Sequence, residues 1–434
     1  MQRALADDLL AWRDSPRRKP LVLNGARQVG KTWLLRQLGT ESFASMAYVS
    51  LDSDATARRI FEADLEPARI VRALSLHLGI DIREGETLIV LDEVQSCPRA
   101  ITSLKYFCED APGHAVAAAG SLLGVSATEG TGFPVGKVDS LDLYPLTFLE
   151  FLDAVGEGGL ADELRSGDTG LMGTLADTYV EHLRRYLVVG GMPEAVLAFA
   201  ADGDFRGARR VQEQILGDCT RDFAKHVPGR LLARMLLVWE SLPRHLAREN
   251  KKFVFGQVRE GARAADFEEA LVWLGEAGLV HRVDRISKPG IPLSAYQDGK
   301  SFKVFSLDVG LLGAMSGLEP SVVLEGSRIF TEFKGALTEQ YVAQELIASC
   351  GATPYYWSAD NSRGEIDFIV QMDGEVFPIE VKAAENLRSK SLRVFSERFD
   401  GMHPRRFSLS GFRDEGWMRN IPLWAIGNAA TWAS

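Results

Sequence analysis

The sequence predicts an α/β protein, with a parallel sheet near the beginning of the chain and a second, smaller α/β region near its end. Three observations support this prediction. An apolar run, a glycine-rich loop and a helical pattern follow one another at residues 21–38; a second apolar run ends in two acids at residues 88–93; and two strands of alternating polarity meet at a turn within residues 365–382. Strands that alternate with helices are typical of parallel sheets, and alternating strands joined by a tight turn are typical of a hairpin.

Composition places the chain among ordinary globular proteins. It has 434 residues, of which 46% are apolar and 25% charged, and this length predicts roughly three domains. The net charge of −10 argues against a polyanion-binding surface over the whole chain. Four cysteines lack C-x-x-C spacing, which indicates buried thiols in a reduced, cytoplasmic compartment rather than a zinc site.

The beginning of the chain predicts neither a membrane span nor a secretory signal. No run of 18 uncharged apolar residues occurs anywhere in the sequence, and residues 1–20 lack a continuous apolar core. These residues instead predict an amphipathic helix, with Leu5, Leu9 and Trp12 on one face.

The first functional motif is Gly25-x-x-x-x-Gly30-Lys31-Thr32, between an apolar strand and a helical pattern. In this context glycines turn the backbone N–H groups toward phosphate, and the start of the helix adds a favourable dipole. Lys31 is predicted to reach the β and γ phosphates of ATP as a catalytic residue, and Thr32 to coordinate Mg²⁺. The alternative is a glycine-rich turn without a ligand. The predicted nucleotide-binding residues of this loop are Gly25, Ala26, Arg27, Gln28, Val29, Gly30, Lys31, Thr32 and Trp33.

Two later strands end in polar residues that complete this prediction. The apolar run at residues 88–91 is followed by Asp92 and Glu93, at the edge where parallel sheets bind ligands. Asp92 is predicted to hold Mg²⁺ through water, and Glu93 to be the catalytic base that orients the attacking water. The alternative is an acidic pair that caps the next helix. The run HAVAAAGS ends at Ser121, which either senses the γ-phosphate or caps a helix; both interpretations stay open.

Together these segments resemble the AAA-type P-loop ATPases of bacteria and archaea, close to the STAND-like archaeal ATPases, that carry a C-terminal domain of unknown function. The resemblance covers nearly the whole chain, and its most particular segments are YPLTFLEFL and GGMPEAV. The other segments that carry it are RKPLVLNGARQVGKTWLL, LIVLDEVQ, AAAGSLLGV, KVFSLDVGLL and FPIEVKAAE. We therefore expect an AAA-type ATPase core at residues 1–152, a helical lid or linker at 153–248, a winged-helix-like module at 249–320 and a nuclease-like domain at 321–434.

One position departs from the family pattern. Members of this family usually have Gly-Arg where this chain has Gly136-Lys137. If that arginine acts on the γ-phosphate, Lys137 is a weaker substitute, because it is a point charge rather than a planar fork. Arg221 is another candidate for such a role, and a surface ion pair is the alternative interpretation for it.

The middle of the chain predicts three successive segments: a loop, then helices, then a winged helix. Residues 153–180 are rich in glycine and acids and predict a loop or insertion, and two helical patterns follow. Residues 251–313 then give helix, turn, helix and two strands, which is the order of a winged helix. Its candidate recognition helix carries Asp266, Glu268, Glu269 and Glu276, with Arg263 just before it. Because these acids would repel DNA phosphates, we expect a structural or protein-docking module rather than a DNA reader.

The segment GEIDFIVQMDGEVFPIEVKAAE predicts a hairpin with an Asp-Gly turn. Alternation places Glu380 and Lys382 on one face of the second strand, and Asp367 shares that face if the register allows it. Carboxylates on one face repel unless a cation lies between them, and hard oxygen ligands select Mg²⁺ or Mn²⁺. The other interpretation is a solvated strand face with an ion pair worth under about 1 kcal/mol.

With an upstream helix that contains Glu339, this hairpin resembles the restriction-endonuclease-like, PD-(D/E)XK, fold. The resemblance implies Glu339, Asp367 and Glu380 as metal ligands and Lys382 as the catalytic lysine, with Glu365 as an alternative first acid. The sequence thus favours an ATP- and Mg²⁺-dependent ATPase with one of two outputs: gated cleavage of DNA, or a signalling or scaffold switch that binds a protein partner and cuts nothing. An oligomer is compatible with either output.

Overall fold

The chain folds into two compact units. The computed structural model describes residues 1–120, 134–248, 251–325, 331–359, 364–383 and 389–433. Residues 2–144 form the N-terminal unit, together with 276–278, and residues 145–275 and 279–434 form the C-terminal unit. The finer division into four domains stays a prediction.

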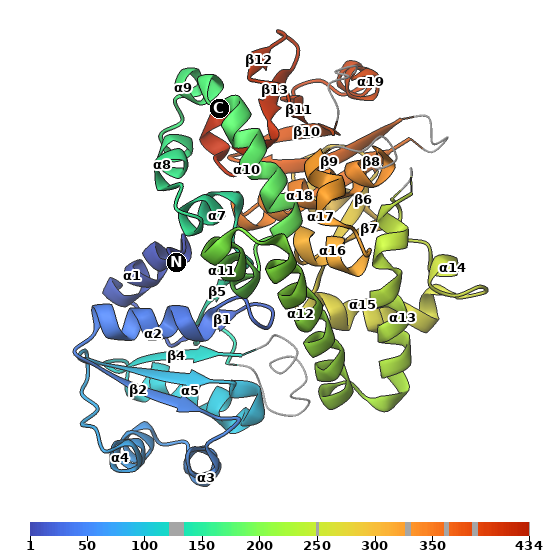
Figure 1. The fold of residues 1–434 in the computed structure, drawn as a ribbon. Coiled ribbons are helices and arrows are strands. Elements are labelled where there is room, and N and C mark those ends of the chain that lie inside the picture. Colours follow the sequence, from blue (N-terminus) through green and yellow to red (C-terminus); the bar gives the residue numbers. More distant parts are fainter. Residues whose placement is uncertain (121–133, 249–250, 326–330, 360–363, 384–388, 434) are drawn as a thin grey trace. The chain divides into compact units, whose positions relative to one another are not determined.

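The N-terminal unit is built on a five-stranded sheet in the order β2-β3-β4-β1-β5, with every neighbouring pair parallel (Figure 1). This confirms the predicted parallel sheet. Among the inner strands, β3 and β4 are buried along their whole length, as strands covered on both faces must be. The strands are β1 (Leu21–Asn24), β2 (Ser45–Ser50), β3 (Thr87–Asp92), β4 (Ala115–Ala119) and β5 (Asp139–Asp142). The helices are α1 (Leu5–Asp14), α2 (Lys31–Ser42), α3 (Ala55–Ala63), α4 (Pro67–Leu78) and α5 (Pro98–Asp110).

The predicted helix at the N-terminus is α1, and it buries the expected apolar face. Leu9 and Trp12 are buried, and the Trp12 indole N–H donates to the Lys19 carbonyl at 2.8 Å. The predicted strands at residues 21–23 and 88–91 are likewise β1 and β3.

Residues 153–180 form helices, and the predicted loop at this place is wrong. Glycines and acids suggested a loop, but here the acids cap helices: Asp168 accepts from the backbone N–H of Gly170 at 2.9 Å. Sparse apolar residues, Ala161 and Leu164 among them, are fully buried and anchor the turns. The helices of this region are α7 (Phe148–Ala154), α8 (Gly158–Ser166), α9 (Thr169–Thr174) and α10 (Ala176–Val189).

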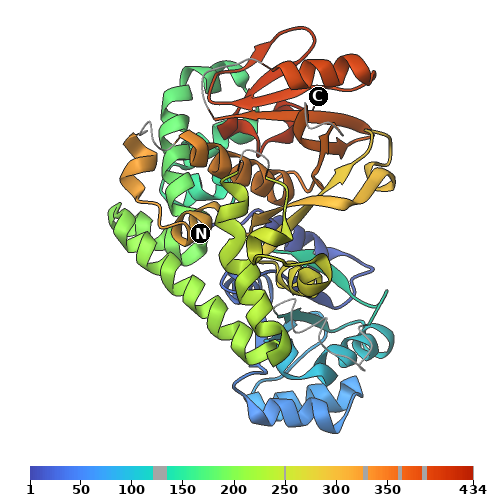
Figure 2. The same cartoon turned by 90° about the vertical axis from the view of Figure 1, so that its right-hand side faces the viewer.

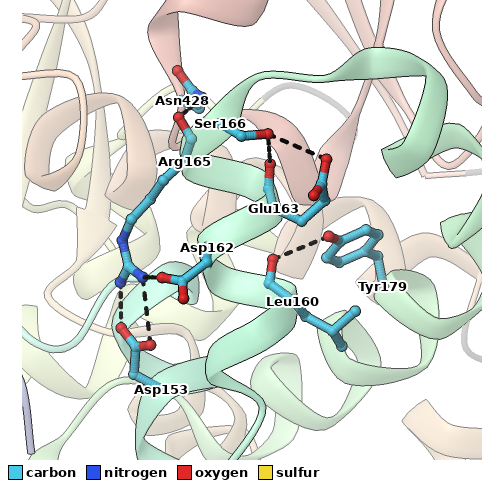
Figure 3. Close-up of polar contacts among 8 residues, drawn as sticks. All are labelled: Asp153, Leu160, Asp162, Glu163, Arg165, Ser166, Tyr179 and Asn428. Carbon is cyan, nitrogen blue, oxygen red and sulfur yellow. Dashed lines mark hydrogen bonds and ion pairs between the residues drawn. The ribbon is translucent and has the colours of Figure 1, made fainter.

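Contacts from distant parts of the chain hold α8 in place (Figure 3). The Asn428 side-chain amide donates to the carbonyl of Leu164 at 2.6 Å, so a residue near the end of the chain satisfies a carbonyl group at the C-terminal end of α8. The Tyr179 hydroxyl donates to the Leu160 carbonyl at 3.0 Å. Arg165 lies between Asp153 and Asp162 and pairs with both.

The two predicted helical patterns, at residues 175–189 and 209–223, are confirmed as α10 and α12. Helices α12 and α13 are joined by a two-residue connection and contact each other (Figure 1 and Figure 2). The remaining helices are α11 (Pro193–Asp202), α12 (Phe205–His226), α13 (Gly229–Leu246), α14 (Phe255–Val258), α15 (Ala264–Glu276), α16 (Val309–Met315), α17 (Pro320–Glu325), α18 (Thr331–Ala348) and α19 (Lys390–Arg398).

The C-terminal unit contains one mixed sheet of eight strands, in the order β12-β13-β11-β10-β9-β8-β6-β7. Strands β9 and β10 form the predicted hairpin, and its turn residues Asp373 and Gly374 both have positive φ, as an Asp-Gly turn of this kind requires. The two strands predicted for the winged helix, β6 and β7, pair antiparallel and continue this sheet at its other edge. The strands are β6 (Val280–Ile286), β7 (Gln297–Ser306), β8 (Tyr355–Ser358), β9 (Glu365–Met372), β10 (Glu375–Lys382), β11 (Arg405–Ser408), β12 (Arg413–Asp414) and β13 (Arg419–Pro422).

A buried polar network joins α18 to the segments on which it packs. The Glu345 carboxylate accepts from the backbone N–H of Phe148 at 2.8 Å and from the Ser349 hydroxyl at 2.6 Å. The Gln344 amide donates to the Tyr186 hydroxyl at 2.6 Å. Burial is the main reason why the pKa of Glu345 rises to about 7, and the nearby charge of Glu150 adds to the effect.

The raised pKa of Glu345 predicts a pH dependence of stability. Its folded pKa of about 7 lies above its ordinary value of 4.5, so the folded protein holds a proton that the unfolded chain has lost between these two pH values. The free energy of unfolding therefore falls as pH rises from 4.5 to 7, by at most about 3 kcal/mol from this group. Glu345→Gln removes this contribution.

We expect thermal unfolding to show the difference. The Tm of Glu345→Gln relative to wild type should be higher at pH 8 than at pH 5. Glu181→Gln, an exposed glutamate on α10, is the matched control and should show the same Tm difference at both pH values. A constant difference for Glu345→Gln as well would contradict the assignment.

Candidate functional site

The backbone of residues 25–30 has the special geometry that a phosphate-binding loop requires. Gly25, Gln28 and Gly30 all have positive φ, at 146°, 63° and 100°. A Cβ on Gly25 would lie 2.3 Å from the Leu143 carbonyl oxygen, so only glycine fits there. Helix α2 begins at Lys31, immediately after Gly30, and its first N–H groups are free of intrahelical partners. The loop and the helix start therefore present N–H groups to one place.

Lys31 folds back over this loop. Its ammonium group donates to the carbonyl oxygens of Gly25 and Ala26, at 2.8 and 2.7 Å. Burial lowers the pKa of Lys31 to about 8, against the opposing charges of Glu93 and Asp92. The contacts place the ammonium group beside the N–H groups of the loop, where it can neutralise a bound phosphate.

Thr32 and Asp92 meet although they lie 60 residues apart. The Thr32 hydroxyl donates to Asp92 Oδ2 at 2.7 Å, and the Tyr48 hydroxyl donates to the same oxygen at 2.7 Å. Asp92 is the last residue of β3 and is buried. The Arg36 guanidinium lies 4.0 Å from the centre of the Tyr48 ring and packs on it. A hydroxyl and a carboxylate held together next to a phosphate-binding loop are the oxygen ligands that suit Mg²⁺.

Glu93 is held by a local contact that the sequence did not indicate. It has a positive φ of 53°, which turns its side chain out of the line of β3. Its carboxylate accepts a hydrogen bond from the Gln95 side-chain amide. Glu93 thus follows the predicted Mg²⁺ residue directly, and its position at the carboxyl edge of the sheet fits a base that orients water.

The other predicted nucleotide-binding residues differ in exposure. Ala26 and Val29 are buried and pack under the loop, whereas the Gln28 and Trp33 side chains are exposed, Trp33 by 45%. Arg27 is half-buried. Ser121 lies outside the described residues.

The two basic residues considered for the γ-phosphate lie elsewhere. Lys137 comes just before β5, whose first residue Asp139 pairs with Leu21 at the start of β1. It therefore lies at the amino edge of the parallel sheet, opposite the edge that carries the phosphate loop, and it pairs with Glu109 at 2.9 Å. Lys137 does not reach a phosphate on the loop of its own chain. Arg221 is exposed on α12 and pairs with Asp218, so a surface ion pair is what the structure shows for it.

In the C-terminal unit the predicted nuclease-like residues come together from three elements. Asp367 on β9 accepts from the backbone N–H of Val381 at 2.8 Å, and Glu380 on β10 pairs with Lys382 at 2.7 Å. Glu339 enters from α18, which packs on β10. Burial and then the charge of Glu339 raise the pKa of Asp367 to about 7.

Two further lysines join these acids, and the sequence interpretation missed both. Lys303 on β7 is 1% exposed, and its ammonium group lies 2.5 Å from Glu365 Oε1 and 3.8 Å from Glu339 Oε2. Lys251 pairs with Glu339 from the other side. Burial lowers the pKa of Lys303, but Glu339, Glu365 and Asp367 outweigh this effect and raise it. For Glu339, burial raises the pKa of the carboxyl group. The charges of Lys251 and Lys303 outweigh this effect, so the pKa of Glu339 lies below its ordinary value.

We call this group the acid–lysine cluster. Its members are Lys251, Lys303, Glu339, Glu365, Asp367, Glu380 and Lys382. Within the described ranges, no three or more His, Cys, Asp and Glu side chains are grouped so that they could hold a metal ion. Helices long and apolar enough to cross a bilayer are also absent from that part of the chain.

Family models match three parts of the chain. Residues 17–152 match a family described as AAA domain. Residues 180–322 match a domain of unknown function, DUF8612, and residues 334–414 match another, DUF4143. The first match supports the predicted AAA-type P-loop ATPase domain, and the restriction-endonuclease-like assignment of the C-terminal part stays a prediction. No curated protein sequence matches the chain.

Three solved structures show a remote similarity, each at 14% identity. The Walker-type ATPase PABY2304 of Pyrococcus abyssi has a TM-score of 0.45 over 73% of this chain and 95% of that one. The ORC1 protein of Aeropyrum pernix in complex with DNA has a TM-score of 0.26 over 72% and 90%. Cdc6p from Pyrobaculum aerophilum has a TM-score of 0.26 over 74% and 92%.

Proposed function

We propose, with the AAA domain of residues 17–152 as the premise, that this protein binds ATP together with Mg²⁺ on loop 25–32 and hydrolyses it. The contact that carries the proposal is the 2.7 Å hydrogen bond from the Thr32 hydroxyl to Asp92 Oδ2. It joins the start of α2 to the end of β3, the two elements that a triphosphate and its cation must both reach.

Each residue has a distinct role in the proposed reaction. The backbone N–H groups of the loop and Lys31 bind the β and γ phosphates. Thr32, and Asp92 through water, would hold Mg²⁺, which would neutralise charge on the phosphate oxygens. Glu93 takes a proton from the water that attacks the γ-phosphorus. The bond from that phosphorus to the β–γ bridging oxygen breaks, and ADP and phosphate leave.

Replacing Lys31 with alanine tests the binding step. We expect the dissociation constant for MgATP, measured by titration calorimetry, to rise at least about tenfold, because the ammonium contact to phosphate is lost. Lys105→Ala removes an exposed lysine of α5 in the same unit and should leave the affinity unchanged. Equal affinity of Lys31→Ala and wild type would remove the phosphate-binding assignment.

For the C-terminal unit we propose a restriction-endonuclease-like fold with a winged-helix-like module beside it. The hairpin β9–β10, the parallel strand β11 and the helix α18 that packs on β10 support the first part. Helices α14 and α15, followed by the antiparallel pair β6–β7, support the second part. ATP binding and hydrolysis would then change how this unit engages a partner.

The charge of α15 favours a protein partner over DNA. Glu268 and Glu269 are exposed on this helix, and Arg263, directly before it, is an exposed cation. An acidic helix would be repelled by the phosphates of a DNA groove. We therefore favour the signalling or scaffold switch as the output of the ATPase over gated cleavage of DNA.

A further inference from the structure

We propose that the ammonium group of Lys303 takes the place of a divalent cation in the acid–lysine cluster, so that the C-terminal unit binds no catalytic metal there and cleaves no phosphodiester bond. The proposal concerns a different site from loop 25–32 and does not depend on ATP binding. It follows from where the lysines lie among the carboxylates.

Lys303 already lies among the carboxylates that a metal ion would need. Lys303 contacts Glu365 at 2.5 Å and lies 3.8 Å from Glu339, two of the acids that the restriction-endonuclease-like resemblance offers as metal ligands. Its stem enters along β7, and its ammonium group also lies 5.0 Å from the centre of the Tyr356 ring. A cation of charge +2 between these carboxylates would lie within about 4 Å of a buried ammonium group, and the two charges would repel strongly in such a site.

The ammonium group of Lys303 cannot leave the cluster to make room for a metal ion. Its side chain is 1% exposed, and a buried ammonium group is stable only when it is paired and hydrogen-bonded. If Glu339 and Glu365 turned to coordinate a metal, Lys303 would be left as an uncompensated buried charge. Lys303 also lies in the middle of a sheet pairing, because its backbone bridges that of Lys252 and pairs with Val283. The strand therefore cannot slide to withdraw the side chain.

Lysines balance most of the negative charge of the cluster. The cluster contains four carboxyl groups, on Glu339, Glu365, Asp367 and Glu380, and three lysines pair with three of them: Lys303 with Glu365, Lys251 with Glu339 and Lys382 with Glu380. A metal-dependent phosphodiesterase site needs uncompensated negative charge to bind its cation. Here the protein's own cations supply the compensation.

Two carboxylate oxygens of the cluster lack a hydrogen-bond partner in the described part of the chain, and they are where a metal ion could bind. Glu380 Oε2 and Glu339 Oε2 are buried and accept no hydrogen bond within the described residues. If a metal binds to this cluster as the restriction-endonuclease-like resemblance implies, Glu380 is one of its ligands. We therefore compare the wild-type full chain with Glu380→Gln, without nucleotide, and measure bound Mn²⁺ from the loss of the free-ion electron paramagnetic resonance signal.

Equal Mn²⁺ binding by the two proteins is the expected result, because any ion at Thr32 and Asp92 is common to both. One additional Mn²⁺ bound by wild type would overturn the proposal. A plasmid incubated with wild type and Mg²⁺ or Mn²⁺, with and without ATP, should stay intact; cleavage that disappears in Lys382→Ala would also overturn it. Neither result depends on the ATP site, which Lys31→Ala tests separately.

Removing the internal cation gives a second measurement. Lys303→Met keeps the length of the side chain and removes its charge. We expect the Tm of the C-terminal unit to fall by about 10 °C, because Glu365 loses its counter-ion and the buried Glu339 loses one of its two cations. A Lys303→Met variant that does not fold at all would also support the proposal, because it would show a larger loss of stability of the same kind. Lys300→Met, an exposed lysine on the same strand, should leave the Tm unchanged. Wild-type stability of Lys303→Met would show that Lys303 does not neutralise the cluster.

Discussion

Glu93→Gln is expected to slow ATP hydrolysis by about 100- to 1,000-fold while the affinity for MgATP stays within a factor of about three. The amide of glutamine has the shape of the carboxylate and can still accept the hydrogen bond that Gln95 donates to this side chain. It cannot accept a proton from water. The change therefore removes the chemical step and keeps the position of the group.

Two measurements separate these effects. Phosphate release under saturating MgATP gives the turnover number, and titration calorimetry gives the affinity. Glu86→Gln is the matched control, because Glu86 is an exposed glutamate directly before the first residue of β3. This variant should turn over ATP at the wild-type rate. A Glu93→Gln variant with wild-type turnover would show that another group orients the water.

Gly191→Ala is expected to lower the free energy of unfolding of the C-terminal unit by at least about 3 kcal/mol. A Cβ on Gly191 would lie 2.0 Å from the carbonyl oxygen of Leu146, and a backbone atom cannot move aside as the end of a flexible side chain can. The two residues are also joined directly, because the Leu146 N–H donates to the Gly191 carbonyl at 2.7 Å. The Gly191 N–H in turn donates to the buried carboxylate of Asp308 at 2.7 Å. A shift at this position therefore disturbs three segments.

Thermal unfolding of the full chain measures this effect. Gly207→Ala is the matched control, because a Cβ at this helical position in α12 meets nothing within 4 Å. It should be neutral or raise stability by up to about 1 kcal/mol, since alanine has the higher helix propensity. If Gly191→Ala unfolded at the same temperature as wild type, the close approach at Leu146 would not exist in solution.

The phosphate loop and its sheet were predictable because their signals are local. Glycine positions, the order of strand, loop and helix, and the acids that end β3 all lie within short stretches of sequence. The contacts of Tyr48 and Gln95 were not predictable. Tyr48 reaches Asp92 only because β2 lies beside β3 in the sheet, and strand order cannot be derived from the composition of a strand. Gln95 reaches Glu93 because of an unusual backbone angle at Glu93.

The helices at residues 153–180 show where composition misleads. Glycine lowers helix propensity, yet caps such as Asp168 and the buried side chains of Ala161 and Leu164 override it through tertiary packing. Lys303 had a usable signal, because it is the charged residue in the apolar run FKVF. That signal indicates a buried charge in need of partners, but the partners lie on α18 and β9, at distances along the chain that a single sequence does not reveal.

The long-range contacts of the C-terminal unit set an order of events during synthesis on the ribosome. Phe148 donates its backbone N–H to Glu345, and Asn428 closes the end of α8 at Leu164, so the first helices of this unit wait for residues made roughly 200 and 260 positions later. Contacts of this separation slow folding. The N-terminal unit draws on residues 2–144 for nearly all of its structure and can fold first as a domain. The nascent chain would then carry a formed nucleotide-binding sheet while the helices behind it still expose apolar faces, and this interval is when the protein most needs chaperones.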